Sequence, residues 1–260
     1  MSAPRESSAH VWTSWSGPAA DDLIRLLSEA TLTLHGLVPW SSNYTFLGEV
    51  SAGGEQALVI YKPIRGERPL WDFPRGTLAK RETAAYVVSQ ALGWDLVPPT
   101  VLRSKGCPHG LGSVQLFVNA DQNAHFFTFR DDPVYRLALQ ALALFDVIAN
   151  NADRKGGHCL SIGEGRVVAI DQGLCFSVEP KLRTVIWDFA GEPIPAIRMA
   201  DLRRLQRELR DEDVPVARQL AELMSRLEVE ALRDRIVALL AEGCFPSPPE
   251  DRRPYPWPLV

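Results

Sequence analysis

The chain has 260 residues, of which 46% are hydrophobic and 23% charged, and its 28 basic and 32 acidic side chains leave a net charge of −4. This composition excludes disordered, collagen-like and disulfide-knot proteins, and the length fits one large domain or two lobes that meet at a cleft. No apolar run reaches the roughly 18 residues of a membrane helix, and the N-terminus lacks a secretory signal, so we expect a cytoplasmic protein.

The first half of the chain predicts a small sheet with one helix. Alternating apolar residues indicate a three-stranded meander, and two more strands follow the helix, so the expected strands span 31–34, 44–50, 57–62, 97–102 and 112–118. The helix is expected to begin after an N-cap at Thr77, to carry Glu82 in its middle and to stop at Gly93.

The second half changes to a helical period. Asp132 and Pro133 open a helix whose residues 134–149 are apolar on nearly all faces, which indicates that it is buried. A polar loop, 150–158, and a hairpin follow, and Asp171 comes directly after the second strand of the hairpin. Further helices are expected near 201–210, 216–224 and 226–242, and the proline-rich tail 245–260 is expected to form an extended strap.

Two aspartates flank the predicted hairpin. Asp153 lies in the polar loop and Asp171 follows the second strand, so the hairpin can bring their carboxylates together. Such a pair can divide proton acceptance from metal binding. Aspartates are also common in surface turns, so the pair alone fits either a site or two ordinary turns.

The order of the polar features resembles a known superfamily. A small polar loop is followed by a strand lysine, a helix glutamate, an Asn-x-Asp-Arg run and an Asp-x-Gly run. This order, over residues ~30–175, resembles the phosphatidylinositol 3-/4-kinase-like and HipA-like atypical kinases. The best match is 145–154, which looks like the catalytic loop of lipid kinases of the 4-kinase type. The chain also resembles a narrower actinobacterial family of phosphatidylinositol 3-/4-kinase-like proteins.

The resemblance implies an α+β, two-lobed protein-kinase-like fold. It places a small β-sheet lobe with one helix at 1–118, where nucleotide would bind. It places a mainly helical catalytic lobe at 119–260, with the proline-rich tail at its end.

The resemblance implies nucleotide contacts in the first lobe. Lys62 would contact the phosphates and form a salt bridge with Glu82, although an edge-strand lysine can also serve only to limit aggregation. The remaining implied contacts are a phosphate loop at Ser41, Ser42 and Asn43 and an inter-lobe hinge beside adenine at Gln115, Leu116, Phe117 and Val118. An ordinary polar turn and a plain core strand explain these two runs as well.

In the second lobe, Asp153 would orient or deprotonate the substrate hydroxyl, and Asn151 and Arg154 would fix the loop around it. Asp171 would bind a divalent metal. Asp146 could brace the loop from the end of the helix, or simply satisfy that helix end.

His158 departs from the kinase pattern, because these kinases usually carry a metal-binding asparagine there. Imidazole is a softer ligand than an amide oxygen, so His158 would favour Mn²⁺ over Mg²⁺, or lower the activity with Mg²⁺. With an ordinary histidine pKa, activity would fall below about pH 6.5. A histidine that is only hydrogen-bonded in the loop remains the alternative. Gln172, in the Asp-x-Gly run, leaves the metal ligand Asp171 intact but weakens the inference of an aromatic-packing switch at that position.

The sequence therefore predicts an ATP- and divalent-metal-dependent kinase that acts on a hydroxyl of a small molecule, a lipid or a protein. A nucleotidyl transferase on the same fold and a nucleotide-binding pseudokinase are the alternatives. The mild acidity argues against a nucleic-acid partner. One basic stretch is either a solvated face or a contact for phosphate or an anionic substrate, and it comprises Arg65, Arg68, Arg75, Lys80 and Arg81.

Overall fold

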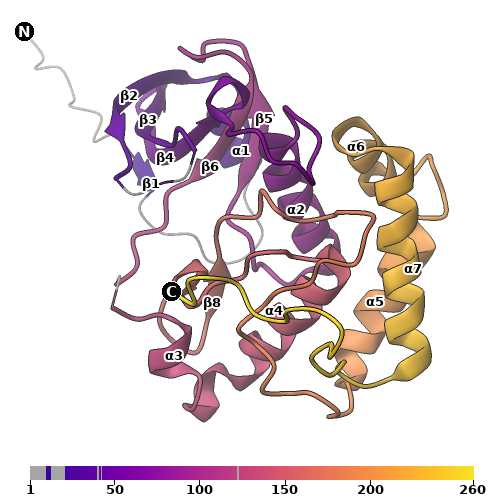
Figure 1. Cartoon of the computed structure of the whole chain (residues 1–260). Helices are drawn as coiled ribbons and strands as arrows, with labels where there is room; N and C mark the ends of the chain where they lie inside the picture. Colours follow the sequence, from indigo (N-terminus) through magenta and orange to yellow (C-terminus); the bar gives the residue numbers. More distant parts are fainter. Residues whose placement is uncertain (1–9, 13–20, 40, 42, 122) are drawn as a thin grey trace, which may run out of the picture.

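A computed structural model of the chain describes residues 10–12, 21–39, 41, 43–121 and 123–260. A β-sheet gathers at one end of the molecule and most of the helices at the other, with α2 between them (Figure 1). The strands of the sheet are β1 (His10–Trp12), β2 (Thr31–Leu37), β3 (Phe46–Ala52), β4 (Glu55–Pro63), β5 (Thr100–Arg103) and β6 (Gly112–Leu116). Their order is β2-β3-β4-β6-β5 with antiparallel neighbours, and β1 runs parallel to β4.

The sheet packs on α1 (Asp21–Glu29), a helix that the sequence analysis missed. Leu23, Leu26 and Leu27 are buried against the sheet, where they meet Val50 and Val59. The signal was present in the sequence, because two aspartates in the first turn and leucines at i, i+3 and i+4 are typical of an amphipathic helix. α1 and the apolar side of the sheet therefore form one core.

A second core joins the remaining helices. They are α2 (Leu78–Leu92), α3 (Phe126–Phe129), α4 (Arg136–Ala149), α5 (Ala196–Glu208), α6 (Pro215–Leu223) and α7 (Arg226–Glu242). Phe145 of α4 and Ile236 of α7 share this core with Val88 of α2. No helix in the described part of the chain is long and apolar enough to cross a membrane.

Most of the predicted elements are confirmed. α2 ends at Gly93 in the left-handed region, and the capping box of Ser225 and Glu228 opens α7. The expected hairpin is β7 (Cys159–Ser161) paired with β8 (Val167–Ala169). Residues 245–260 form no helix or strand, and the carbonyl of Pro254 accepts hydrogen bonds from the Thr184 amide and the Trp187 indole, so the tail is a strap across the helical lobe.

α2 is buried on several faces, because it contacts β5 and β6 on one side and α5 and α6 on another. Its Arg81 is 2% exposed and pairs with Glu228 of α7, while a second nitrogen donates to the carbonyl of Cys175. Arg81 therefore holds α2 on the helical lobe. For Arg81, both interpretations of the basic stretch, a solvated face and a contact for phosphate or an anionic substrate, are wrong, because its guanidinium is enclosed.

We expect Arg81→Ala to lower the free energy of unfolding by about 3–5 kcal/mol, because it leaves the buried Glu228 carboxylate without its cation. Urea denaturation followed by circular dichroism measures this. Arg25→Ala is the matched control: Arg25 pairs with Asp22 on the surface, so its loss should cost about 0.5 kcal/mol or less. An equal loss of unfolding free energy in the two variants would contradict the role of Arg81 in holding α2 on the helical lobe.

Candidate functional site

Three charged groups meet where the sheet faces the helical lobe. Lys62 of β4 pairs with Glu82 of α2, and its Nζ lies 2.8 Å from Oδ1 of Asp171. The second oxygen of Glu82 accepts a hydrogen bond of 2.9 Å from the backbone N–H of Gln172. The structure thus brings together a lysine, a glutamate and an aspartate that are separated in sequence by up to 109 residues.

Lys62 and Asp171 keep their charges at neutral pH, whereas burial raises the pKa of Glu82. Burial alone would lower the pKa of Lys62, but the carboxylates of Asp171 and Glu82 outweigh it and raise that pKa. Lys62 in turn holds the pKa of Asp171 well below its usual range. A positive ammonium and a negative carboxylate therefore lie side by side, with the Asp171 side chain still 51% exposed and able to contact a ligand.

The loop after α4 is built on a buried ion pair. Asp146 and Arg154 have 0% side-chain exposure, and the Asp146 carboxylate lies 3.0 Å from the Arg154 Nε. The same carboxylate accepts hydrogen bonds from Asn151 Nδ2 at 3.1 Å and Thr184 Oγ1 at 2.9 Å. Asp146 therefore braces the loop. Arg154 and Asn151 lie behind the loop, where they fix its path and do not face the cavities.

Asp153 is the loop residue that faces outward. Its backbone N–H donates to Asn151 Oδ1 at 2.9 Å, its side chain is 28% exposed, and Lys155 Nζ lies 3.5 Å from its Oδ2. Burial raises the pKa of Asp153 to about 6. The positive charge of Lys155 lowers this pKa, and the negative charge of Asp171 raises it further. A carboxylate with a pKa near neutrality is suited to accept a proton.

The imidazole of His158 faces the carboxylate of Asp171. His158 Nδ1 lies 3.1 Å from the carbonyl oxygen of Asp153, which can only accept, and 3.5 Å from the backbone N–H of Lys155, which can only donate. We assign the proton to Nδ1 on the shorter of these two contacts. Nε2 then carries a lone pair 3.5 Å from Asp171 Oδ2. Asp171 has a left-handed backbone, with φ of 61°, which is unusual for aspartate and common at functional sites.

The expectation of histidine protonation near pH 6.5 is wrong. Burial lowers the pKa of His158 to about 4, so the ring is neutral at physiological pH and Nε2 is free to bind a cation. Within the described ranges no group of three His, Cys, Asp or Glu side chains gathers as a metal site. A cation held by His158 and Asp171 would need its other ligands from a substrate or from water.

Two cavities meet at this cluster. The β6 cavity, of about 410 Å³, is lined by Gln115, Leu116, Phe117 and Val118 and also by Val38, Ile60, His158, Leu160 and Ile170. The α2 cavity, of about 320 Å³, is lined by Asp153, Glu82, Arg68 and Leu174 among others. Ser41, Thr45, Lys62 and Asp171 line both. The lysine and the aspartate therefore stand at the junction.

The predicted loop and hinge residues occupy the walls of these cavities. Ser41 Oγ is hydrogen-bonded to Thr45 Oγ1 at 2.7 Å, and Asn43 Oδ1 accepts from the backbone N–H of Arg68 at 2.8 Å. Ser42 lies outside the described residues. The amide of Gln115 is used within the sheet, where Nε2 donates to Thr100 Oγ1 at 2.8 Å.

Sequence reasoning missed the part that Gln172 plays. Its side-chain oxygen accepts from Arg154 Nη2 at 2.7 Å, while its backbone N–H contacts Glu82. The sequence carried only an indirect signal for this contact. A buried arginine such as Arg154 needs several hydrogen-bond acceptors, and the side chain of Gln172, next to Asp171, can supply one. Thr184 donates a hydrogen bond to the Asp146 carboxylate, and no local sequence pattern predicts this contact.

Comparison with a solved structure shows a kinase-like fold. Over 84% of this chain and 94% of the other, the structure superposes on the Helicobacter pylori proinflammatory kinase CtkA, with a TM-score of 0.50 and 11% identity. The fold is thus the two-lobed kinase-like fold. The sequence is also 28% identical over 180 residues to phosphatidylinositol 4-kinase gamma 4 of Oryza sativa subsp. japonica, a match that covers 55% of this chain and 31% of that protein.

A nearly full-length relative shows the family. Protein Rv2133c of Mycobacterium tuberculosis is 40% identical over 271 residues, which cover 92% of this chain and 95% of that protein. The chain belongs to the same family as Protein Rv2133c. No protein-family model matches the sequence.

Proposed function

We propose that this protein is an ATP- and divalent-metal-dependent phosphotransferase that moves the γ-phosphoryl group of ATP to a hydroxyl of a small molecule, a lipid or a protein. The observation that carries the proposal is the position of Lys62 and Asp171 at the junction of two cavities, with Glu82 and Asp153 in the wall of the α2 cavity beside them. The fold shared with a kinase structure supports the reaction class. The proposal treats 1–118 as the nucleotide-binding lobe and 119–260 as the catalytic lobe. Membership of the actinobacterial phosphatidylinositol 3-/4-kinase-like family stays a prediction.

The β6 cavity suits the nucleoside. Its volume of about 410 Å³ lies in the usual range of roughly 300–1,000 Å³ for small-molecule sites, and its lining is largely apolar. The segment 115–118 would lie beside adenine, and the phosphates would extend to Lys62 at the junction. Transfer then depends on positioning and on charge stabilisation.

Asp153 supplies the base in this mechanism. The acceptor oxygen attacks the γ-phosphorus, the bond from that phosphorus to the β–γ bridging oxygen breaks, and its electron pair leaves with ADP. The hydroxyl proton passes to the Asp153 carboxylate. Asn151, Arg154 and Asp146 hold the loop so that this carboxylate keeps its position.

His158 and Asp171 would hold Mg²⁺ or Mn²⁺. The Asp171 carboxylate suits both ions, and the softer imidazole of His158 suits Mn²⁺ better than Mg²⁺; phosphate oxygens and water would complete the shell. A lone pair on His158 Nε2 faces the ionised Asp171 carboxylate at 3.5 Å. When bound, the ion neutralises charge on the phosphates.

ATP labelled at the α or the γ phosphorus tests the proposal, with Mg²⁺ and with Mn²⁺ and a pool of hydroxyl acceptors. We expect product labelled only from the γ position, and a loss of about 10²–10⁴-fold in Asp153→Asn, which lacks the base. Lys105→Ala, at an exposed lysine away from both cavities, should match the wild type. Label transferred only from the α position would indicate a nucleotidyl transferase, and ATP binding without turnover a pseudokinase.

The rate should depend on the protonation of Asp153. Because its pKa in the free protein is raised to about 6, the carboxylate is ionised and active above that pH, and kcat/KM should fall about tenfold for each unit below it. His158 stays neutral through this range, since its pKa is about 4. Initial rates between pH 5 and 8 measure the profile, and circular dichroism at each pH controls for unfolding. A flat profile down to pH 5 would contradict the role of Asp153.

His158→Asn should shift the metal preference toward Mg²⁺, because an amide oxygen replaces a nitrogen ligand. The readouts are the Mn²⁺/Mg²⁺ activity ratio, which should fall, and Mn²⁺ affinity by paramagnetic resonance, which should weaken. Asp171→Asn serves as the comparison and should lose activity with both ions. An unchanged ratio and an unchanged Mn²⁺ affinity would show that His158 is only hydrogen-bonded in the loop.

A further inference from the structure

The segment that joins β4 to α2, residues 64–77, is fixed at several points around the α2 cavity. Asn43 Oδ1 accepts from the Arg68 backbone at 2.8 Å, and Glu67 Oε1 accepts from the Ala79 backbone at 2.9 Å. Asp72 pairs with Lys181 Nζ at 2.7 Å, which ties the segment to the helical lobe. The backbone that carries Arg68 therefore has a defined position.

Close packing of this segment against the β2–β3 connection adds to that restraint. The Tyr44 amide donates to the carbonyl of Gly66 at 3.1 Å. A Cβ at Gly66 would lie 2.5 Å from the Tyr44 Cβ, so only glycine permits the two chains to approach this closely. Arg68 thus leaves the segment two residues after a tight contact.

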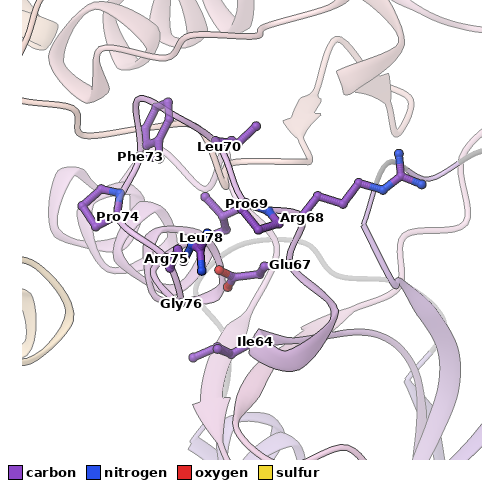
Figure 2. Close-up of a pocket in the computed structure, with 10 residues that line it drawn as sticks. All are labelled: Ile64, Glu67, Arg68, Pro69, Leu70, Phe73, Pro74, Arg75, Gly76 and Leu78. Atoms are coloured by element: carbon purple, nitrogen blue, oxygen red, sulfur yellow. The ribbon is translucent and has the colours of Figure 1, made fainter.

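Of the cations in the α2 cavity, Arg68 is the one whose side chain has no partner among the described residues. The cations that line this cavity are Lys62 and Arg68, and Lys62 is engaged by Glu82 and Asp171. The Arg68 guanidinium makes no hydrogen bond or ion pair with any residue that the structure describes. Arg68 also lines a neighbouring cavity of about 320 Å³, together with Leu70 and Phe73. Figure 2 shows the Arg68 side chain extending away from Phe73 and from the other residues labelled there. An open guanidinium in a cavity wall is suited to bind a carboxylate or a phosphate through two parallel hydrogen bonds.

The position of Arg68 separates the acceptor from the nucleoside. Arg68 and Asp153 line the α2 cavity and are absent from the lining of the β6 cavity, whereas Lys62 and Asp171 line both. Arg68 is thus on the same side of the phosphate junction as the proposed base. Apolar contact area in this cavity comes from Tyr44, Leu70 and Leu174.

Building on the proposed function, we infer that Arg68 binds an anionic group of the acceptor, so the acceptor is a hydroxyl compound that also bears a phosphate or a carboxylate. The hydroxyl oxygen of this compound forms the new bond to the γ-phosphorus, its proton passes to Asp153, and ADP leaves with the electron pair of the broken bond. The anionic group stays at Arg68 and takes no part in bond making. Arg68 is in this way the residue that selects the substrate class.

Paired hydroxyl acceptors with and without an anionic group test this inference. Glycerol and glycerol 3-phosphate form the soluble pair. In the membrane arm, phosphatidylcholine vesicles contain either diacylglycerol, a hydroxyl lipid without a phosphate, or phosphatidylglycerol, a hydroxyl lipid with one. In the wild type the anionic member should react at least about tenfold faster in kcat/KM, the size expected for one charge-assisted contact. Transfer to the soluble compound alone identifies a free metabolite, and transfer to the vesicles alone identifies a lipid headgroup.

Arg68→Ala should raise KM for the anionic acceptor at least about tenfold and abolish the preference, with KM for ATP unchanged. Arg65→Ala is the matched control, because Arg65 is exposed on the same segment and lines neither cavity, and it should behave as the wild type. A raised KM for ATP in Arg68→Ala with the acceptor preference intact would assign Arg68 to the nucleotide and overturn the inference.

A binding measurement needs no turnover and separates the two proposals. Titration of glycerol 3-phosphate, followed by ³¹P magnetic resonance, should show binding to the wild type and to Arg65→Ala, and weaker binding to Arg68→Ala. Binding that is equal in all three proteins, or absent from the wild type, would overturn the inference even where ATP is turned over. Binding that depends on Arg68 without any turnover of ATP would support the anion site and refute the phosphotransferase.

Discussion

Asp146 and Arg154 are two opposite charges with no exposure to solvent, and the shape of the candidate site depends on their pairing. A buried pair of this kind is tolerated only where hydrogen bonds satisfy the remaining donors and acceptors. Here the partners come from Asn151, Thr184 and Gln172. The pair therefore fixes the end of α4, the loop that carries Asp153, and the chain on either side of Asp171.

From this pair a chain of polar contacts crosses to the sheet. Arg154 contacts the side chain of Gln172, the backbone of Gln172 contacts Glu82, and Glu82 holds Lys62. One carboxylate oxygen of Glu82 contacts Lys62 and the other accepts from the backbone N–H of Gln172. The position of α2 is therefore coupled to both the strand lysine and the Asp-Gln-Gly turn. Because Arg81 ties the same helix to α7, α2 links the sheet to the helical lobe along its length.

The charge of −4 is compatible with phosphate chemistry because the useful positive charge is local. Arg154, which looks available in the sequence, is enclosed by its acceptors and serves the structure of the loop. Lys62 stands at the junction of the cavities with its charge secured by two carboxylates, and Arg68 carries an open guanidinium nearby. In the proposed function, Lys62 contacts the phosphates of the nucleotide and Arg68 binds the acceptor.

The sequence by itself determined the local structure and the order of the polar residues. The period of the apolar residues and the caps at Gly93 and Ser225 predicted α2 and α7, because these signals act within one or two turns, whereas α1 was not predicted. Tertiary structure alone decided which charges face the cavities: Arg81 and Arg68 belong to one basic stretch, yet packing on several faces of α2 buries the first and leaves the second open. It also placed Lys62 beside Asp171 and lowered the pKa of His158, because such contacts and burial arise between segments that are distant in sequence.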